Sequence, residues 1–479
     1  MDKPPGADSD NSKKLGVLPL TALVVGGIVG AGIFSLPQNM AEKAGAGAIL
    51  IAWAITFIGM YFLAHIFVWL TMTRPEIEDG VYGYVRHGFG NYLGFNAAWG
   101  YWISGWVGIG SYLVIIFDSL GAFPLFSFFE KNGIETLIAE IVLLWLVTLF
   151  VLRGVRSAAL LNVVITIAKI LPILVFIVCC AMSFKADIFR TDFWSSPTLG
   201  SVMDQVKSTM LVTVWVFLGI ESATVYGTRA KSNMVIMKAT VYGFLVTVIL
   251  LGCVSILALG IVPQSQLAQM QDPSMAYVLE VAVGPWGAKF IHIGLLVSVS
   301  GALLAWTLIS TEMLYLASRG KDHTAPRIFG RLNKAETPAP ALLLTTCLVT
   351  GLMFYGHWHS AGYKTFIELG ASAVLIPYWL CAAYALKLCL QSKGQHNKEL
   401  VVSILAVIYA SWLIFAAGAN YFLFNMLMYM AGIFFFIKAC REKKCSMFPD
   451  ITSKIVVVIV FALGTYALYL LLTGTLTVM

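Results

Sequence analysis

The chain has 479 residues, of which 59% are hydrophobic and only 11% charged, and its mean hydropathy is +0.85. A water-soluble protein cannot bury so large an apolar fraction, so the composition excludes a soluble globular protein and predicts an all-α polytopic membrane protein. The formal net charge is +7, but in a membrane protein the location of the charges says more than their sum.

Thirteen apolar runs are long enough to cross a bilayer, which takes about 20 helical residues. The first eight are Leu15–Pro37, Gly45–Thr71, Tyr92–Ala122, Thr136–Leu152, Ala158–Ser183, Gln205–Thr228, Val235–Val262 and Ala288–Ser318. After a basic linker come Pro340–Tyr355, Thr365–Lys387, Leu400–Gly418, Tyr421–Ile437 and Ile455–Leu472. Only Ala419 and Asn420 separate the eleventh run from the twelfth. Residues 1–14 are polar, which predicts a disordered cytoplasmic tail.

The distribution of Lys and Arg predicts the orientation of the chain. If the N-terminus is cytoplasmic, alternate connections hold most of the 31 Lys and Arg residues, many of them in the linker 319–339. The opposite connections hold few, among them Lys43, Lys289 and Lys364. Such an excess of positive charge marks the cytoplasmic side. An odd number of spans then places the C-terminus outside.

The first run contains an unusual group of glycines: Gly26, Gly27, Gly30 and Gly32 lie within seven residues. Each glycine destabilises a helix interior by about 1 kcal/mol relative to alanine, so we expect the helix to be interrupted here. In hydrocarbon an interrupted backbone survives only where protein buries it or where it lines a wet cavity. The alternative is structural, because Gly26 and Gly30 also have the spacing that lets two membrane helices pack closely.

The sixth run favours the first interpretation. It is broken in its middle by the residues LGIES, from Leu218 to Ser222. Two interrupted helices, each opening one half of a chain, indicate a transporter built from inverted repeats.

The loops exclude several other classes of protein. The longest connections, near residues 72–91 and 319–339, are too short for a catalytic or signalling domain. The sequence contains no HExxH, no phosphate-binding loop and no metal-spaced pair of histidines, so no enzyme activity, metal, cofactor or nucleic-acid partner is expected. A channel would need an open polar pore, whereas the polar interruptions here cluster at one depth.

Four motifs together resemble one transporter family: GGIVGAGIFSLPQN, AGAGAILIAW, DGVYGYVRHGFGNYLGF and VWVFLGIESATVYG. This combination resembles the basic amino acid/polyamine antiporters of the amino acid–polyamine–organocation superfamily, most of all arginine/ornithine antiporters and the related lysine permeases. The resemblance implies a 5+5 inverted-repeat transporter fold over residues 15–387, with discontinuous helices 1 and 6. Residues 388–479 would add peripheral spans, giving twelve spans and a thirteenth.

The interrupted helices also predict a substrate site. A free amino acid is a zwitterion, so a membrane site must replace water at both charged ends. Backbone N–H groups at Gly30, Ala31 and Gly32, at the positive end of a half-helix, are expected to hold the carboxylate. Carbonyl groups around Gly26, Gly27 and Gly219 are expected to accept from the ammonium. Small residues are needed because a side chain would block the ligand's approach to the backbone.

The resemblance adds three aromatic residues to this site. Trp215 corresponds to the aromatic that covers the bound side chain, Trp306 to a second aromatic, and Tyr101 to an outer-gate tyrosine. Cation–π attraction is worth about 0.5 to 2 kcal/mol, enough to select a cationic side chain while still allowing its release. Each residue alone could be packing or an interface anchor, but their joint occurrence at motif-matched positions favours a role in binding the ligand.

The sequence also departs from the family pattern. Gly27 replaces an asparagine that some members carry, Ala31 replaces a serine, and Ile109 replaces a third-span asparagine. Members that exchange arginine for agmatine use those polar groups, so the departures favour exchange between two amino acids. Ser372, five residues before Pro377, is a further candidate to line the cavity.

Two of the ionisable residues inside the predicted spans stand out, because an uncompensated charge is costly there. The resemblance implies that Glu221 is a gating glutamate; the alternative is a fixed acceptor for backbone amides of the broken helix. In related transporters a lysine at the position of Lys169 substitutes for a sodium ion. Here Lys169 could act as a proton site or as a permanent cation that braces the first helix.

Together these features predict an antiporter of cationic amino acids in the cell membrane, a bacterial inner membrane, that takes up arginine and releases ornithine by alternating access. Arginine/agmatine or lysine/cadaverine exchange and a proton-coupled lysine permease are the alternatives. The partners implied are these substrates and the lipid bilayer; the sequence leaves a homodimer open.

Overall fold

The computed structural model describes residues 16–129, 133–154, 158–191, 193–195, 199–221, 231–359, 362–392 and 394–476, without the side chains of 19, 23, 158–168 and 233. The expected tail at residues 1–14 and the end of the sixth run, Ser222–Thr228, lie outside these ranges. Every regular element within the described ranges is helical.

Nine helices of the described chain are long and apolar enough to cross a membrane, or ten if one bent pair counts as a single span. The nine are α4 (Ala46–Thr73), α6 (Asn91–Gly121), α7 (Ile134–Leu152), α13 (Asn233–Ala258), α16 (Pro285–Ser318), α17 (Ala339–Trp358), α18 (Tyr363–Gln391), α19 (Asn397–Lys443) and α20 (Ile451–Leu472). The bent pair is α2 (Val17–Ile28) and α3 (Gly32–Ala41), while α8 (Ala158–Ser183) and α11 (Val202–Trp215) occupy the fifth and sixth runs. Short helices are α9 (Ala186–Arg190) and α14 (Gln264–Leu267), with 3₁₀ turns at Pro124–Phe126 and Arg327–Gly330.

The break in the first run is where the glycines predict it. Helix α2 ends at Ile28, Val29 is extended (ψ 97°), and α3 begins at Gly32 at an angle of 45°. The run does not stop at Pro37, as we expected from the sequence, because α3 continues through Pro37 to Ala41. Membrane helices tolerate an internal proline where neighbouring groups compensate for the lost hydrogen bond.

The break in the sixth run begins earlier than predicted. Helix α11 starts behind the N-cap Ser201, whose side chain accepts from the amide of Asp204, and ends at Trp215. Residues 216–221 form turns rather than helix. The interruption therefore includes Val216 and Phe217 as well as the predicted Gly219.

One arrangement of helices occurs twice in the chain. The ten-residue helix α5 (Gly80–Phe89) is joined to α6 by Gly90, with φ 87° and ψ −178°. The ten-residue helix α15 (Ser274–Val283) is joined to α16 by Gly284, with φ 94° and ψ −177°. Both junctions need glycine because the positive φ is strained for other residues. The third and eighth runs thus share the same entry geometry.

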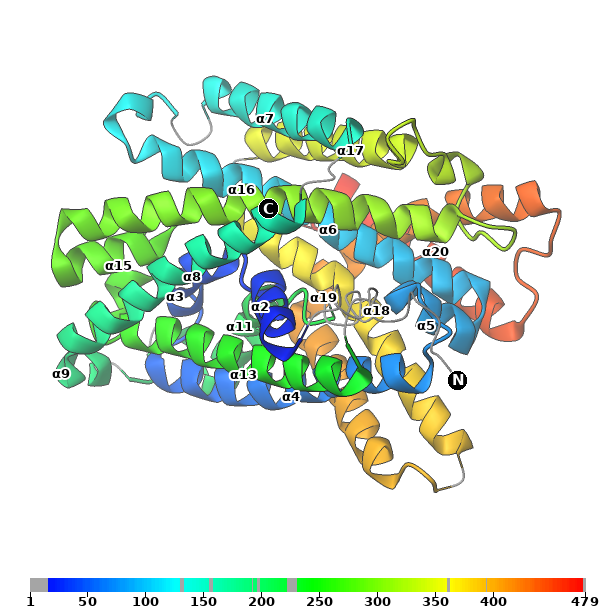
Figure 1. Cartoon of the computed structure of the whole chain (residues 1–479), viewed down its shortest axis with the longest axis horizontal. Helices are drawn as coiled ribbons and strands as arrows, with labels where there is room; N and C mark the ends of the chain where they lie inside the picture. The colour runs from blue at the N-terminus through cyan, green and yellow to red at the C-terminus, as the bar shows by residue number, and fades with distance from the viewer. Residues whose placement is uncertain are drawn as a thin grey trace, which may run out of the picture.

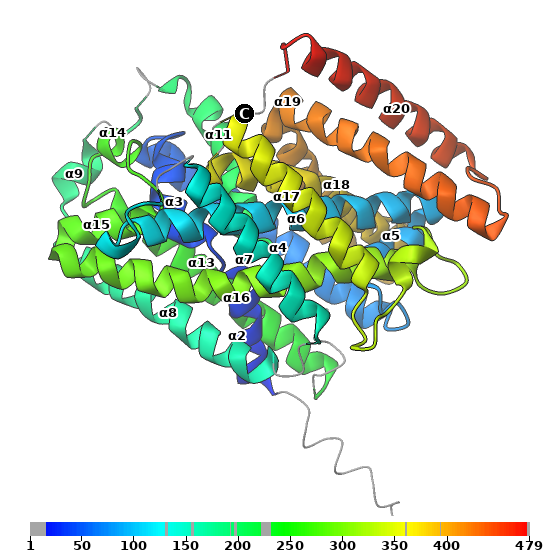
Figure 2. The ribbon, with the colours of Figure 1, turned by 90° about the horizontal axis from the view of Figure 1, so that it is seen from above.

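The interrupted helices lie at the centre of the bundle. Figure 1 shows α2 near the middle of the molecule, between α8 and α13, both of which it contacts. Helices α7 and α17 run side by side along one flank. Figure 2 shows α19 and α20 side by side on another, and α19 is kinked at Gly418 (φ 85°, ψ 166°), between the predicted eleventh and twelfth runs. The peripheral helices carry exposed large apolar side chains, such as Met182, Ile249 and Val458, which suits a surface that faces lipid rather than water.

Candidate substrate site

Two cavities meet at the break between α2 and α3. A small pocket of about 10 Å³ lies between the break and the rings of Tyr112, Trp215 and Trp306. A wide cavity of about 830 Å³ shares Gly27, Gly30 and Trp306 with the small pocket and extends to the ends of α4, α7 and α16. The small pocket has room for about one water molecule, so the site is contracted here and accessible through the wide cavity.

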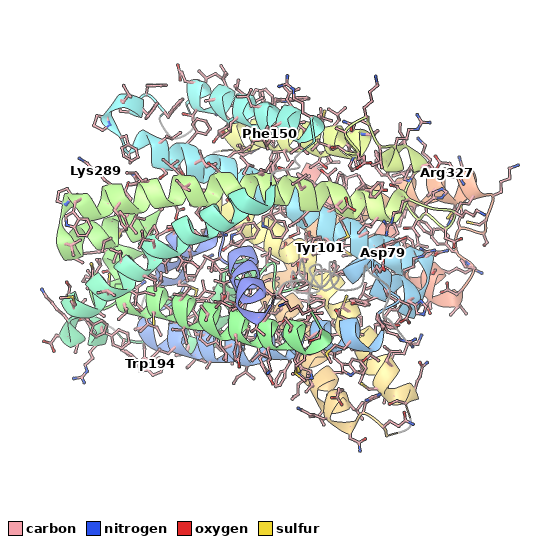
Figure 3. The ribbon with its side chains drawn as sticks, in the orientation of Figure 1. Asp79, Tyr101, Phe150, Trp194, Lys289 and Arg327 are labelled. Atoms are coloured by element: carbon pink, nitrogen blue, oxygen red, sulfur yellow. The ribbon has the colours of Figure 1, made fainter. Side chains whose placement is uncertain are left out.

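The wide cavity opens toward one end of the molecule. In Figure 3, Tyr101, which lines it, lies midway along the molecule, and Asp79, which also lines it, lies closer to the end that carries Arg327. Lys289 and Trp194 lie toward the opposite end. The opening therefore faces the end that holds the basic linker.

The break exposes backbone groups to the pocket. No carbonyl of a described residue accepts from the amide of Gly30 or Ala31, both of which line the pocket at the start of α3. A side chain at Gly32 would come within 2.8 Å of Val216 and 2.9 Å of Trp215. Glycine is thus required at residue 32 by close packing against the sixth span. The free amides at a helix N-terminus form a site that favours an anion.

The two breaks touch each other. Gly219 has φ 97°, and a Cβ there would lie 2.7 Å from the carbonyl oxygen of Gly27. Both the backbone angle and the contact therefore require glycine at residue 219. This close approach places the first and sixth spans against each other at the depth of the pocket.

Lys169 is bound to the broken first helix. Its ammonium donates to the carbonyl of Gly26 and, over 2.9 Å, to that of Val29. These carbonyls lie at the end of α2, where the helix dipole is negative, so a cation is stabilising there. Because the Gly26 carbonyl is occupied by Lys169, it is not free for the substrate ammonium.

Glu221 joins three spans. Its buried carboxylate accepts from the hydroxyl of Tyr101 on α6 and, over 2.6 Å, from that of Tyr378 on α18. Tyr378 was not among the predicted site residues, although it directly follows Pro377 in the tenth run. Tyr101, expected at an outer gate, lies instead in this cluster on the wall of the wide cavity.

The predicted aromatic residues lie on both sides of the break. Trp306 lines both cavities and stacks against Tyr101, with ring centroids 6.3 Å apart. The ring centroids of Trp215 and Tyr112 lie 6.1 Å apart. Tyr112 is a further aromatic residue of the site that was not predicted from the sequence.

Ser372 does not belong to this group. Its hydroxyl donates to the carbonyl of Leu369 and accepts from Asn425 on α19 over 2.8 Å, and it lines neither cavity as described. Its position favours a role in packing α18 against α19 rather than in lining the substrate pocket. Every other predicted site residue lines one of the two cavities.

Charged residues surround the mouth of the wide cavity. Glu78, Asp79, Glu312 and Glu336 contribute carboxylates, and Arg319 pairs with Asp79 over 2.5 Å. The acidic excess attracts cations toward the cavity. Among the described residues, no group of three His, Cys, Asp or Glu side chains could hold a metal ion.

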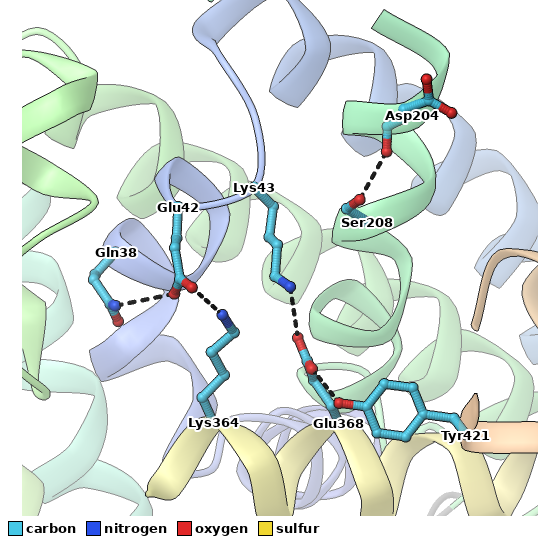
Figure 4. Close-up of polar contacts among 8 residues, drawn as sticks. All are labelled: Gln38, Glu42, Lys43, Asp204, Ser208, Lys364, Glu368 and Tyr421. Carbon is cyan, nitrogen blue, oxygen red and sulfur yellow. Dashed lines mark hydrogen bonds and ion pairs between the residues drawn. The ribbon is translucent and has the colours of Figure 1, made fainter. Parts of the chain in front are cut away.

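The opposite end of the site is closed by ion pairs. Figure 4 shows Glu42 at the end of α3 bound to Lys364 at the start of α18. Beside it, Lys43 lies 3.8 Å from Glu368, whose carboxylate also accepts from Tyr421 over 2.5 Å. We call Glu42, Lys43, Lys364 and Glu368 the α3–α18 latch.

A helical bundle with a broken central helix, a cavity open to one end and ion pairs at the other has the architecture of a membrane transporter. The profile of the amino acid permease family matches residues 15–424. The chain therefore belongs to the amino acid permease family, within the amino acid–polyamine–organocation superfamily, and is a multi-pass membrane protein.

Its relatives are antiporters of arginine. The chain is 44% identical to the arginine/ornithine antiporter of Pseudomonas aeruginosa over 96% of its own length and 98% of the relative. It is 40% identical to the arginine/agmatine antiporter of Chlamydia felis, covering 91% of this chain and 92% of the relative. It is 39% identical to the putative arginine/ornithine antiporter of Escherichia coli, covering 89% and 92%. The resemblance seen in the sequence motifs is confirmed.

Proposed function

We propose that this protein is a secondary antiporter of cationic amino acids, favouring uptake of arginine in exchange for ornithine. The observation that carries the proposal is the meeting of free amides at Gly30 and Ala31 with the aromatic rings of Trp215 and Trp306 at the inner end of a wide cavity. The amides suit the substrate carboxylate, and the rings suit its cationic side chain. The names of the relatives agree with this chemistry.

The two ends of the site support exchange by alternating access. A carrier must close one side while the other is open, and here the wide cavity is open while the α3–α18 latch closes the opposite side. We propose that the open side is the cytoplasm, because the basic linker lies there. In this proposal the N-terminus is cytoplasmic and the protein resides in the bacterial inner membrane.

The repeated entry geometry of α6 and α16 supports two inverted repeats over residues 15–387. In this proposal the breaks at Val29 and Gly219 occupy equivalent positions in the two repeats. The helices after residue 387 are peripheral, and α20 is the thirteenth span.

Glu221 and Lys169 have separate roles in this proposal. Glu221, with Tyr101 and Tyr378, gates the wide cavity by tying α6 and α18 to the sixth span. Lys169 braces the unwound first helix as a permanent cation, which its bonds to Gly26 and Val29 favour over a proton site.

Exchange of arginine for agmatine is the second candidate, because several relatives carry that name. Gly27 has no side chain and Ala31 has no hydroxyl. Family members that exchange arginine for agmatine use polar groups at these positions, so their loss favours ornithine over agmatine as the exchanged substrate. One assay separates the candidates: vesicles preloaded with ornithine, agmatine, cadaverine or buffer are offered labelled arginine or lysine. We expect ornithine to drive arginine uptake and buffer to drive none. Equal uptake into empty vesicles would contradict antiport.

A further inference from the structure

A third cavity with a different lining lies at the end of the molecule opposite the wide cavity. It has a volume of about 230 Å³ and is lined by residues at the start of α7 and α18 and at the end of α6 and α17. Helix α7 begins at this cavity with Gly133 and reaches the wide cavity with Val151, so the two cavities lie at opposite ends of the same helix. We call it the acidic cavity.

Three carboxylates line the acidic cavity: Asp118, Glu140 and Asp272. The only lysine in its described lining, Lys364, has its ammonium on Glu42 in the α3–α18 latch. The ammonium of Lys364 is therefore already paired in the latch.

Glu140 is the residue that points to a ligand. Its side chain is 6% exposed and lines the cavity, yet no described residue forms a hydrogen bond or an ion pair with its carboxylate. Burying an ionised carboxylate without a partner is costly, so a cation that enters the cavity beside Glu140 would be stabilised there.

The lining also indicates what kind of cation fits. Leu137, Met353 and Phe366 supply apolar surface beside the carboxylates, which suits an alkyl chain that ends in a charged group. The described residues hold no group of three metal ligands, and the volume exceeds what a bare ion needs. An organic cation with a short aliphatic stem matches both features.

Tyr363 connects the acidic cavity to the substrate site. It is buried, lines the acidic cavity, and lies near Asp272 as well as near Trp215 and Tyr112 of the central pocket. The ring of Tyr363 would therefore separate a cation bound in the acidic cavity from the central pocket.

We propose that the acidic cavity is a second binding site for the cationic substrate, which takes its guanidinium or alkyl-ammonium group on the side closed by the latch. This inference rests on the proposed function for the identity of the ligand. Substrate captured here enters the central pocket when the latch opens.

Equilibrium binding of labelled arginine to the purified protein tests the site without requiring transport. We expect two arginines per wild-type chain and one in Glu140→Gln, which keeps the side-chain shape but removes the charge. Gly362→Leu is a second variant that fills the cavity: apart from its chain neighbours, a Cβ at residue 362 meets no atom of a described residue within 4 Å, so the backbone accommodates it. Glu135→Gln, exposed in the first turn of the same helix, is the matched control and should still bind two. A single site in wild type, or two in both cavity variants, would overturn the proposal.

Sided transport separates this site from the proposed function. In oriented vesicles, Glu140→Gln and Gly362→Leu should raise the KM for arginine on the latch side about tenfold, the usual order for one charged hydrogen bond. The KM on the wide-cavity side and the maximal rate should not change. Equal changes on both sides would indicate a structural role, and sodium stimulation lost in Glu140→Gln would assign the cavity to an inorganic ion; either result overturns the proposal. Failure of wild type to exchange arginine for ornithine, with two arginines still bound, would refute the proposed exchange and leave this site standing.

Discussion

The aromatic residues beside the break are expected to contribute to the affinity for arginine. Because Trp215 and Trp306 border the pocket, Trp306→Leu and Trp215→Leu should each weaken the apparent affinity for arginine about 2- to 30-fold, the range that cation–π attraction supplies. The measurement is counterflow of labelled arginine in liposomes. Trp286→Leu, an exposed tryptophan at the start of the same helix as Trp306, is the control. Unchanged uptake by both pocket variants would remove the aromatic role.

The cluster around Glu221 makes a prediction about rate. A hydrogen bond to a charged group contributes about 1.5 to 3 kcal/mol, so Tyr378→Phe should slow exchange about tenfold or more, and Glu221→Ala should slow it further. Tyr384→Phe is a matched control on the same helix, because the buried Tyr384 hydroxyl has no partner among the described residues. The assay is exchange rate against pH. A Glu221→Ala protein with the wild-type rate and pH profile would show that this carboxylate is not a gate.

At the scale of helices, the sequence predicted the features that depend on local backbone propensity, which are the two helix breaks. The glycines at 26–32 break the first span because helix propensity is lost there, and Gly219 marks the sixth-span break because only glycine adopts its φ of 97°. The sequence could not predict the contacts between residues of different spans, because these depend on which spans pack together. The carbonyls that bind Lys169 and the pairing of Tyr378 with Glu221 join residues more than 100 positions apart. The contact between Ser372 and Asn425 was beyond prediction for the same reason, because the position of Ser372 along α18 does not say which neighbouring helix it faces.

The ion pairs of the α3–α18 latch are expected to shift the balance between the two open states of the transporter. Exposed ion pairs contribute about 0.2 to 1 kcal/mol each, so Lys364→Ala should shift the balance between the two open states by about 1.5- to 5-fold. The shift should favour the state open on the latch side, and should appear as a changed ratio of the arginine KM values measured from the two sides. The exchanged pair Glu42→Lys with Lys364→Glu restores opposite charges and should recover the wild-type ratio. A ratio unchanged by Lys364→Ala would show that the latch carries no bias.

For the whole molecule, the wide cavity predicts which side of the membrane reaches the substrate site. Ala305 lines that cavity beside Trp306, and a cysteine there should react with a membrane-impermeant thiol reagent added from the cytoplasm. The natural cysteines must first be replaced, because Cys347 and Cys445 are exposed.

Glu135→Cys provides the opposite expectation within the same background. Glu135 is exposed at the start of α7, the end away from the wide cavity, so its cysteine should react only from outside. Arginine should slow labelling at residue 305, because bound substrate fills the space between Trp306 and the break, and should leave residue 135 unaffected. Labelling of both positions from the same side would contradict a cavity closed at one end, and reversed sidedness of the two would invert the proposed orientation. The two cysteines mark opposite ends of the bundle. Labelling them from each side reports the orientation of the protein and the access to its cavity without a measurement of transport.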